Sequence, residues 1–87
     1  MTTIPTFNYA QVSADVRRVL QMAFGSNVAI RTEEGEHGTV FVRIVSDHFD
    51  GLSERAKQDK IWKVLRRELK ADAQAVALVM AFGTDQI

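Results

Sequence analysis

Residues 39–45 read TVFVRIV. Alternate residues of an extended chain share one face, and the face formed by Val40, Val42 and Ile44 is wholly aliphatic. The opposite face also carries apolar side chains, around a single arginine. A run that is apolar on both faces predicts a strand in the middle of a sheet.

The residues before this run predict its partner strand. Residues 27–32 alternate in polarity, with Val28 and Ile30 on the face better suited to burial. Residues 33–38 read EEGEHG, a polar stretch with two glycines that is typical of a hairpin connection longer than the tightest turns. We therefore expect two antiparallel strands joined by this loop.

Apolar residues at helical spacing predict a helix on either side of the hairpin. The first begins near Asn8 and stops at Gly25, and the second is capped by Ser53, reaches about Ala71 and is continuous or broken near residues 58–59. The expected buried positions are Val12, Val16, Val19, Leu20 and Ala23 in the first helix, and Ile61, Val64, Leu65 and Leu69 in the second. Glu68 falls near the centre of the second apolar stripe, where a carboxylate is costly unless it is paired, so we expect it to reach Arg31, Arg43 or a backbone donor.

Residues 73–82, AQAVALVMAF, predict a last strand that is buried on both faces. A strand–helix–strand connection is right-handed, so this strand should lie parallel to the central one, with both helices on one face. We expect an α/β (α+β) two-layer sandwich with a three-stranded mixed sheet. Residues 1–8 should form a flexible N-terminal arm and residues 9–87 a single domain.

Three runs resemble the BolA-like family, and the likeness covers about residues 12–86. VRIVSDHFDG, residues 42–51, is similar to the family's strand that ends in a serine and is followed by a spaced Phe-x-Gly. KIWKVLRREL, residues 60–69, is similar to its aliphatic-aromatic-x-x-Leu helix, and AQAVAL, residues 73–78, to its last strand. The resemblance implies an αββααβ BolA-like fold, shared with class II KH domains.

The resemblance also implies candidate ligands for a 2Fe-2S cluster shared with a monothiol glutaredoxin. Family members that ligate a cluster use a histidine or cysteine in the hairpin loop, where this chain has His37, and a histidine at the start of the last strand, where it has Gln74. A glutamine amide is a weak, neutral donor beside an imidazole, so Gln74 argues against the usual cluster sharing. The family's Arg-His-Arg run is replaced by Lys57, Gln58 and Asp59.

Each histidine also has a simpler interpretation. One histidine cannot make a metal site, so a solvated loop residue is favoured for His37 over a metal or cluster ligand. His48 lies between Asp47 and Asp50, and residues of this composition cap free backbone groups more often than they bind metal. Phe49 beside them is the expected core anchor.

A basic stripe follows the second helix. It consists of Lys60, Lys63, Arg66, Arg67 and Lys70. At 3.6 residues per turn these five fall within an arc of about 120° opposite the apolar stripe. The stripe predicts phosphate contacts with nucleic acid or docking to an acidic protein, and the alternative, which we favour, is the solvated face of an amphipathic helix.

The composition limits the classes of function. Eleven lysines and arginines balance eleven aspartates and glutamates, and 46% of the residues are hydrophobic. The absence of cysteine excludes disulfides and cysteine metal ligands, and no nucleophile–base pair or phosphate-binding glycine loop indicates an enzyme. The chain has neither a basic, apolar leader nor a run of about 18 apolar residues, so we expect a cytoplasmic protein with no membrane contact.

The leading interpretation is a non-enzymatic interaction or regulatory module in iron or redox regulation. Its partner, a monothiol glutaredoxin or another protein, should dock at His37, Gln74 and the basic stripe. The alternative is a KH-like, nucleic-acid-binding transcriptional or stress regulator that uses the basic stripe. We expect a monomer or weak homodimer that binds no cofactor alone.

Overall fold

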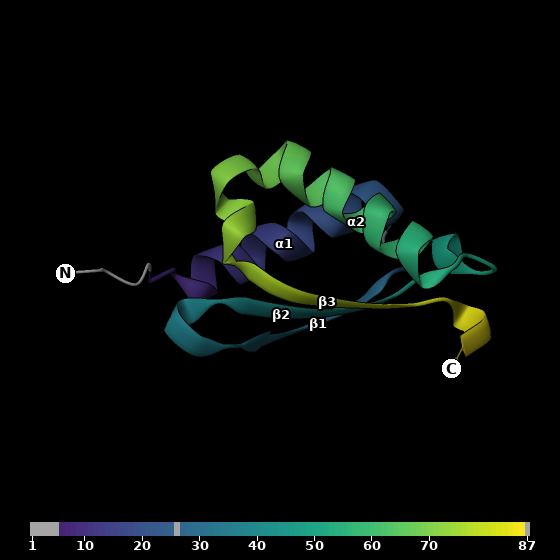
Figure 1. The fold of residues 1–87 in the computed structure, drawn as a ribbon, viewed down its shortest axis with the longest axis horizontal. Helices are drawn as coiled ribbons and strands as arrows, with labels where there is room; N and C mark the ends of the chain where they lie inside the picture. The colour runs from purple at the N-terminus through teal and green to yellow at the C-terminus, as the bar shows by residue number, and fades with distance from the viewer. Residues whose placement is uncertain (1–5, 26, 87) are drawn as a thin grey trace.

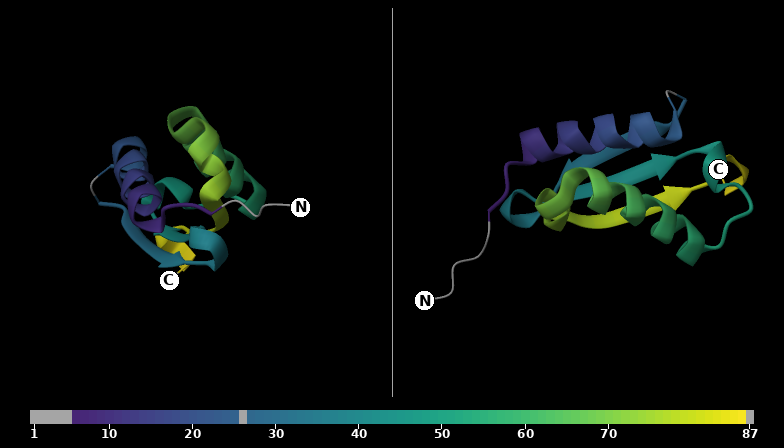
Figure 2. Two further views of the ribbon diagram at one scale, coloured as in Figure 1. Left: turned by 90° about the vertical axis from the view of Figure 1, so that its left-hand side faces the viewer. Right: turned by 90° about the horizontal axis from the view of Figure 1, so that it is seen from above.

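The protein is a two-layer α+β sandwich with a three-stranded mixed sheet, as the sequence predicts. The computed structural model describes residues 6–25 and 27–86. The helices and strands within them are α1 (Tyr9–Phe24), β1 (Ala29–Glu34), β2 (Val40–Val45), α2 (Glu54–Leu69) and β3 (Val76–Phe82). The strand order is β1-β2-β3, with β1 antiparallel and β3 parallel to β2. Both helices lie on one face of the sheet (Figure 1), and Figure 2 shows them side by side.

The core lies between the helix layer and the sheet. Val40, Val42 and Ile44 of β2 are at most 1% exposed, so the predicted inner face of the central strand is confirmed. The expected helical positions are buried too, with one error: Ala23 is exposed and Phe24 is buried in its place. The Phe24 ring packs edge-on against Phe49, with ring centroids 5.1 Å apart, so the last turn of α1 contributes to the core.

Helix α2 is continuous and shorter than the sequence predicts. The Ser53 hydroxyl caps it by accepting a hydrogen bond from the Ala56 amide at 3.1 Å, as expected. The helix ends at Leu69 because Lys70 adopts a positive φ of 54°, and a 3₁₀ segment, Lys70–Ala75, follows. Strand β3 therefore begins three residues later than expected.

Glu68 does not reach the sheet. It lies one position before the buried Leu69, and this single step turns its side chain by about 100° around the helix. The carboxylate is exposed and pairs with Arg67 at 3.3 Å, so the expected contact with Arg31 or Arg43 is wrong.

Strand β3 is not buried on both faces. Val79 and Ala81 face the helices and are buried, whereas Leu78 and Met80 are 47% and 43% exposed on the opposite face. The prediction failed because both helices cover the same face, and nothing in the part of the chain that the structure describes covers the other. The sheet thus has one open face.

The residues just before α1 contact the hairpin. The Phe7 amide donates a hydrogen bond to the His37 carbonyl at 2.8 Å, and the Phe7 side chain packs against the core. The Asn8 side chain caps α1 by accepting from the Gln11 amide at 3.2 Å. Residues 1–5 of the expected arm lie outside the described residues.

Candidate functional site at the hairpin end

His37 occupies a tight turn at one end of the sheet. The turn is a 3₁₀ segment, Glu36–Gly38, in which His37 has a left-handed backbone with φ 59° and ψ 30°. Such a conformation is uncommon for residues other than glycine, although histidine is among those that adopt it more often. The hydrogen bond from Phe7 to the His37 carbonyl holds the turn from the side of α1.

A shallow groove of about 670 Å³ lies against this turn. We call it the hairpin groove. Its lining includes Glu34, Glu36 and His37 from the turn side, Phe41 from β2 and Ala77 from β3. The groove therefore combines two carboxylates, one imidazole and an apolar wall.

Gln74 lies at the same end of the sheet as His37. It is exposed in the 3₁₀ segment that precedes β3, and β3 pairs with β2 from Val40 and Val76 onward. Because these strands are parallel, the hairpin turn and the segment before β3 meet at one end of the molecule (Figure 1). Gln74 does not line the groove itself, and Ala77 does.

The donor set at this end is poor for a metal. No group of three or more histidine, cysteine, aspartate or glutamate side chains in residues 6–25 and 27–86 is arranged to hold an ion. His37 supplies one imidazole and Gln74 a neutral amide, so these two residues do not fit a 2Fe-2S cluster without ligands from another protein.

The alternation of side chains along β2 could have identified Phe41 as part of the hairpin groove. Phe41 belongs to the face of TVFVRIV that points away from the helices, and the sequence pattern already placed it there. Ala77 carried no such signal, since a register irregularity between Val40 and Phe41 decides which residues of β3 lie beside β2. Glu34 and Glu36 belong to the polar loop that the sequence identified only as a connection.

The basic stripe is exposed along its whole length. The Arg66 guanidinium stacks over the Trp62 ring at 5.5 Å, and Arg67 pairs with Glu68. The 3₁₀ segment after α2 descends from the end of the stripe toward the start of β3 (Figure 1). Hence Lys70 lies at the same end of the molecule as the hairpin groove.

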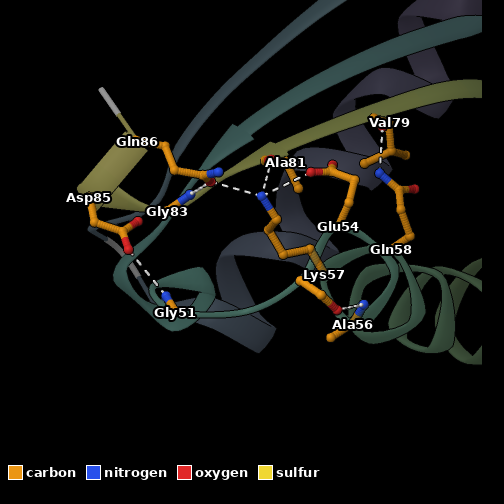
Figure 3. Close-up of polar contacts among 11 residues, drawn as sticks. Gly51, Glu54, Ala56, Lys57, Gln58, Val79, Ala81, Gly83, Asp85 and Gln86 are labelled. Carbon is orange, nitrogen blue, oxygen red and sulfur yellow. Dashed lines mark hydrogen bonds and ion pairs between the residues drawn. The ribbon is translucent and has the colours of Figure 1, made fainter.

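Lys57 and Gln58 of α2 form hydrogen bonds within the fold (Figure 3). Lys57 is 1% exposed, and its Nζ donates to the Ala81 carbonyl at 3.2 Å and to the Gln86 side chain at 2.8 Å. The Gln58 amide donates to the Val79 carbonyl at 2.8 Å and its oxygen accepts from the Trp62 indole. Both side chains therefore hold the outer edge of β3.

The loop around His48 acts as a set of caps. The Ser46 hydroxyl accepts from the His48 amide at 3.1 Å, and the His48 ring packs edge-on against Phe24. Asp50 accepts from the Thr84 hydroxyl at 2.6 Å, and this bond, followed by the Thr84 and Asp85 amides, lowers the pKa of Asp50 below its ordinary 3.8. The Asp50 carboxylate therefore ties the loop to the C-terminal segment.

Comparisons with protein-family models, with curated proteins and with solved structures found no match. Among the described residues neither helix is long and apolar enough to cross a bilayer.

Proposed function

We propose that this chain is a non-enzymatic, cytoplasmic docking module whose protein partner binds at the hairpin groove. The observation that carries the proposal is that His37 lies in a fixed turn beside the hairpin groove. Its turn is held by the Phe7 amide and opens onto a groove with an apolar wall and two carboxylates. A preorganised turn loses little conformational entropy on binding, which favours docking at this site.

The partner that we propose is a monothiol glutaredoxin or a protein of that type, in iron or redox regulation. The BolA-like resemblance supports it, and so does the position of His37 and Gln74 at one end of the sheet. A cluster would need most of its ligands from the partner, because the chain has no cysteine. Docking therefore rests on protein contacts, with His37 as a supplementary ligand.

Titration of cluster-loaded monothiol glutaredoxin with the full chain tests this function. We expect a complex by calorimetry and a change in the visible spectrum that His37→Ala removes. Gln74→His should enlarge the change because it restores an imidazole at the second position. His48→Gln is the matched control, since this histidine lies beyond the opposite end of β2 and should leave the spectrum of the complex unchanged.

Two results would overturn parts of the proposal. An unchanged spectrum with both the native chain and Gln74→His rules out cluster sharing. The absence of any complex with the glutaredoxin rules out this class of partner.

A second candidate function is nucleic-acid binding by the basic stripe. It is favoured by the exposure of all five side chains, four of which have no ion-pair partner in residues 6–25 and 27–86.

Phosphate contacts predict that log affinity for a duplex falls with log salt by a slope of about −0.9 per neutralised phosphate. Gel-shift binding that Lys63→Glu with Arg67→Glu abolishes, and that Arg18→Glu on α1 does not, would support it. No binding at low salt excludes it.

A further inference from the structure

The open face of the sheet carries a basic row between apolar side chains. Strand register aligns Arg31, Arg43 and Met80 across the three strands. The neighbouring row toward the hairpin consists of Glu33, Phe41 and Leu78, and the row on the other side includes Val45 and Phe82. Rows on one face of a sheet repeat about every 6.6 Å along the strands.

The apolar part of this face is accessible. Phe41, Leu78 and Met80 are 38%, 47% and 43% exposed, and together with the two arginines they surround a depression of about 130 Å³. They come from neighbouring strands, so they form one patch. An exposed apolar patch on one face of a sheet is a candidate surface for another molecule to cover.

The two arginines lack an anionic partner. Arg31 and Arg43 are directly opposite each other in the antiparallel ladder, and like charges in that arrangement destabilise a sheet. Neither forms an ion pair with any residue that the structure describes. The Arg43 guanidinium lies 5.1 Å from the centre of the Phe82 ring, which fixes it over the face. A carboxylate placed between the guanidinium groups would accept charge-assisted hydrogen bonds from both.

Helix side chains occupy part of each edge of the sheet. Arg17 of α1 donates to the Ile30 carbonyl of β1 at 3.0 Å. On the other edge, Gln58 and Lys57 of α2 donate to carbonyls of β3. A partner strand would bind through the backbone groups of these edges, so the side-chain contacts oppose the addition of a strand. The face of the sheet opposite the helices stays accessible.

We propose that the open face docks an amphipathic helix of a partner protein that has one carboxylate within its apolar stripe. The carboxylate lies between Arg31 and Arg43, and apolar side chains on both sides of it cover Phe41, Leu78 and Met80. A helix satisfies its own backbone hydrogen bonds, so it needs no hydrogen bond from the edges of the sheet, and helices commonly cover the second face of a sheet.

The charge of the face favours this occupant over two others. In a two-fold dimer the same surface meets itself, so a second copy of the chain would bring its own two arginines to a face that already carries Arg31 and Arg43. Like charges oppose that contact. A nucleic acid would bring several phosphates to a face that offers one basic row and places Glu33 beside it.

The test uses three synthetic helical peptides that share a leucine stripe and differ only in one central residue, Glu, Gln or Lys. Binding to the full chain is measured by fluorescence anisotropy at low salt. We expect the Glu peptide to bind at least tenfold more tightly than the Lys peptide. The double variant Arg31→Glu with Arg43→Glu should reverse this order, while Arg18→Glu on α1, outside both the open face and the basic stripe, should leave it unchanged.

Two further measurements separate the outcomes. Leu78→Ser keeps both arginines and should weaken all three peptides alike, which keeps the proposal testable if the double variant does not fold. Phe41 is not a suitable site for the test, because it also lines the hairpin groove. An unchanged peptide order in the double variant overturns the proposal. So does Arg43-dependent binding of a single-stranded oligonucleotide that displaces the Glu peptide.

Discussion

Gly38→Ala should lower the free energy of unfolding by about 2–5 kcal/mol. Gly38 has φ 76°, a left-handed conformation in which a Cβ costs roughly 1–2 kcal/mol. A Cβ there would also collide with the Phe7 carbonyl oxygen, a backbone atom that cannot rotate away. The backbone shifts that accommodate such a collision typically cost a further 1–3 kcal/mol. Urea denaturation followed by circular dichroism measures the loss.

Gly51→Ala is the matched control for the backbone conformation. Gly51 has φ 75°, almost the value of Gly38, but nothing lies within 4 Å of the position of its Cβ. We therefore expect Gly51→Ala to lower the free energy of unfolding only by the cost of the backbone conformation, about 1–2 kcal/mol. If both variants lose the same free energy of unfolding, the Phe7 carbonyl does not restrict residue 38.

The same substitution connects stability to the hairpin groove. Displacement of Phe7 removes the hydrogen bond that holds the His37 carbonyl, so the turn loses its preorganisation. Partner binding at the groove should then weaken in Gly38→Ala and stay unchanged in Gly51→Ala. Calorimetry with the glutaredoxin, at a temperature where both variants are folded, distinguishes this effect from general destabilisation.

Local patterns predicted the elements and the inner faces well. The alternation in TVFVRIV identified the central strand, and the Ser53 cap and the positions of Ile61 and Leu65 identified α2, because burial on one side imposes a period on the sequence. The start of β3 was missed since it depends on the positive φ of Lys70, which is uncommon for a residue other than glycine.

Tertiary arrangement accounts for the other errors. The apolar residues of β3 could not show whether a second helix layer exists, so Leu78 and Met80 were expected in a core. The sequence placed His37 in a loop, but the groove beside it depends on the pairing of β3 with β2, which brings Ala77 to the turn. Long-range pairing of this kind leaves no local pattern.

The sequence carried a signal for the burial of Lys57 that the predicted buried positions of the second helix did not include. Lys57 lies four residues before Ile61 and eight before Leu65, on the buried stripe of α2. Burial is tolerated because carbonyl and amide oxygens of Ala81 and Gln86 accept from the ammonium group, and Glu54 pairs with it at 3.0 Å.

Lys57→Met should lower the free energy of unfolding by about 1–3 kcal/mol. Methionine fills nearly the same volume, so packing is kept, but the Ala81 carbonyl loses its donor, and an unsatisfied buried acceptor costs about 1–3 kcal/mol. Glu54 is 67% exposed, and water can solvate its carboxylate once the lysine is gone. The expected loss therefore comes from the edge of β3 and not from a stranded charge.

Lys60→Met separates this contact from a general effect of removing a cation from α2. Lys60 is exposed on the same helix, so its replacement should change stability by no more than about 0.5 kcal/mol. Hydrogen exchange at the Gly83 amide, which donates to the Gln86 side chain at 2.8 Å, should quicken in Lys57→Met only, because Lys57 orders that side chain.

Some buried ion pairs can be replaced by apolar residues without loss of stability. If Lys57→Met is as stable as the native chain, Lys57 does not hold the edge of β3, and the side-chain contact at that edge rests on Gln58 alone.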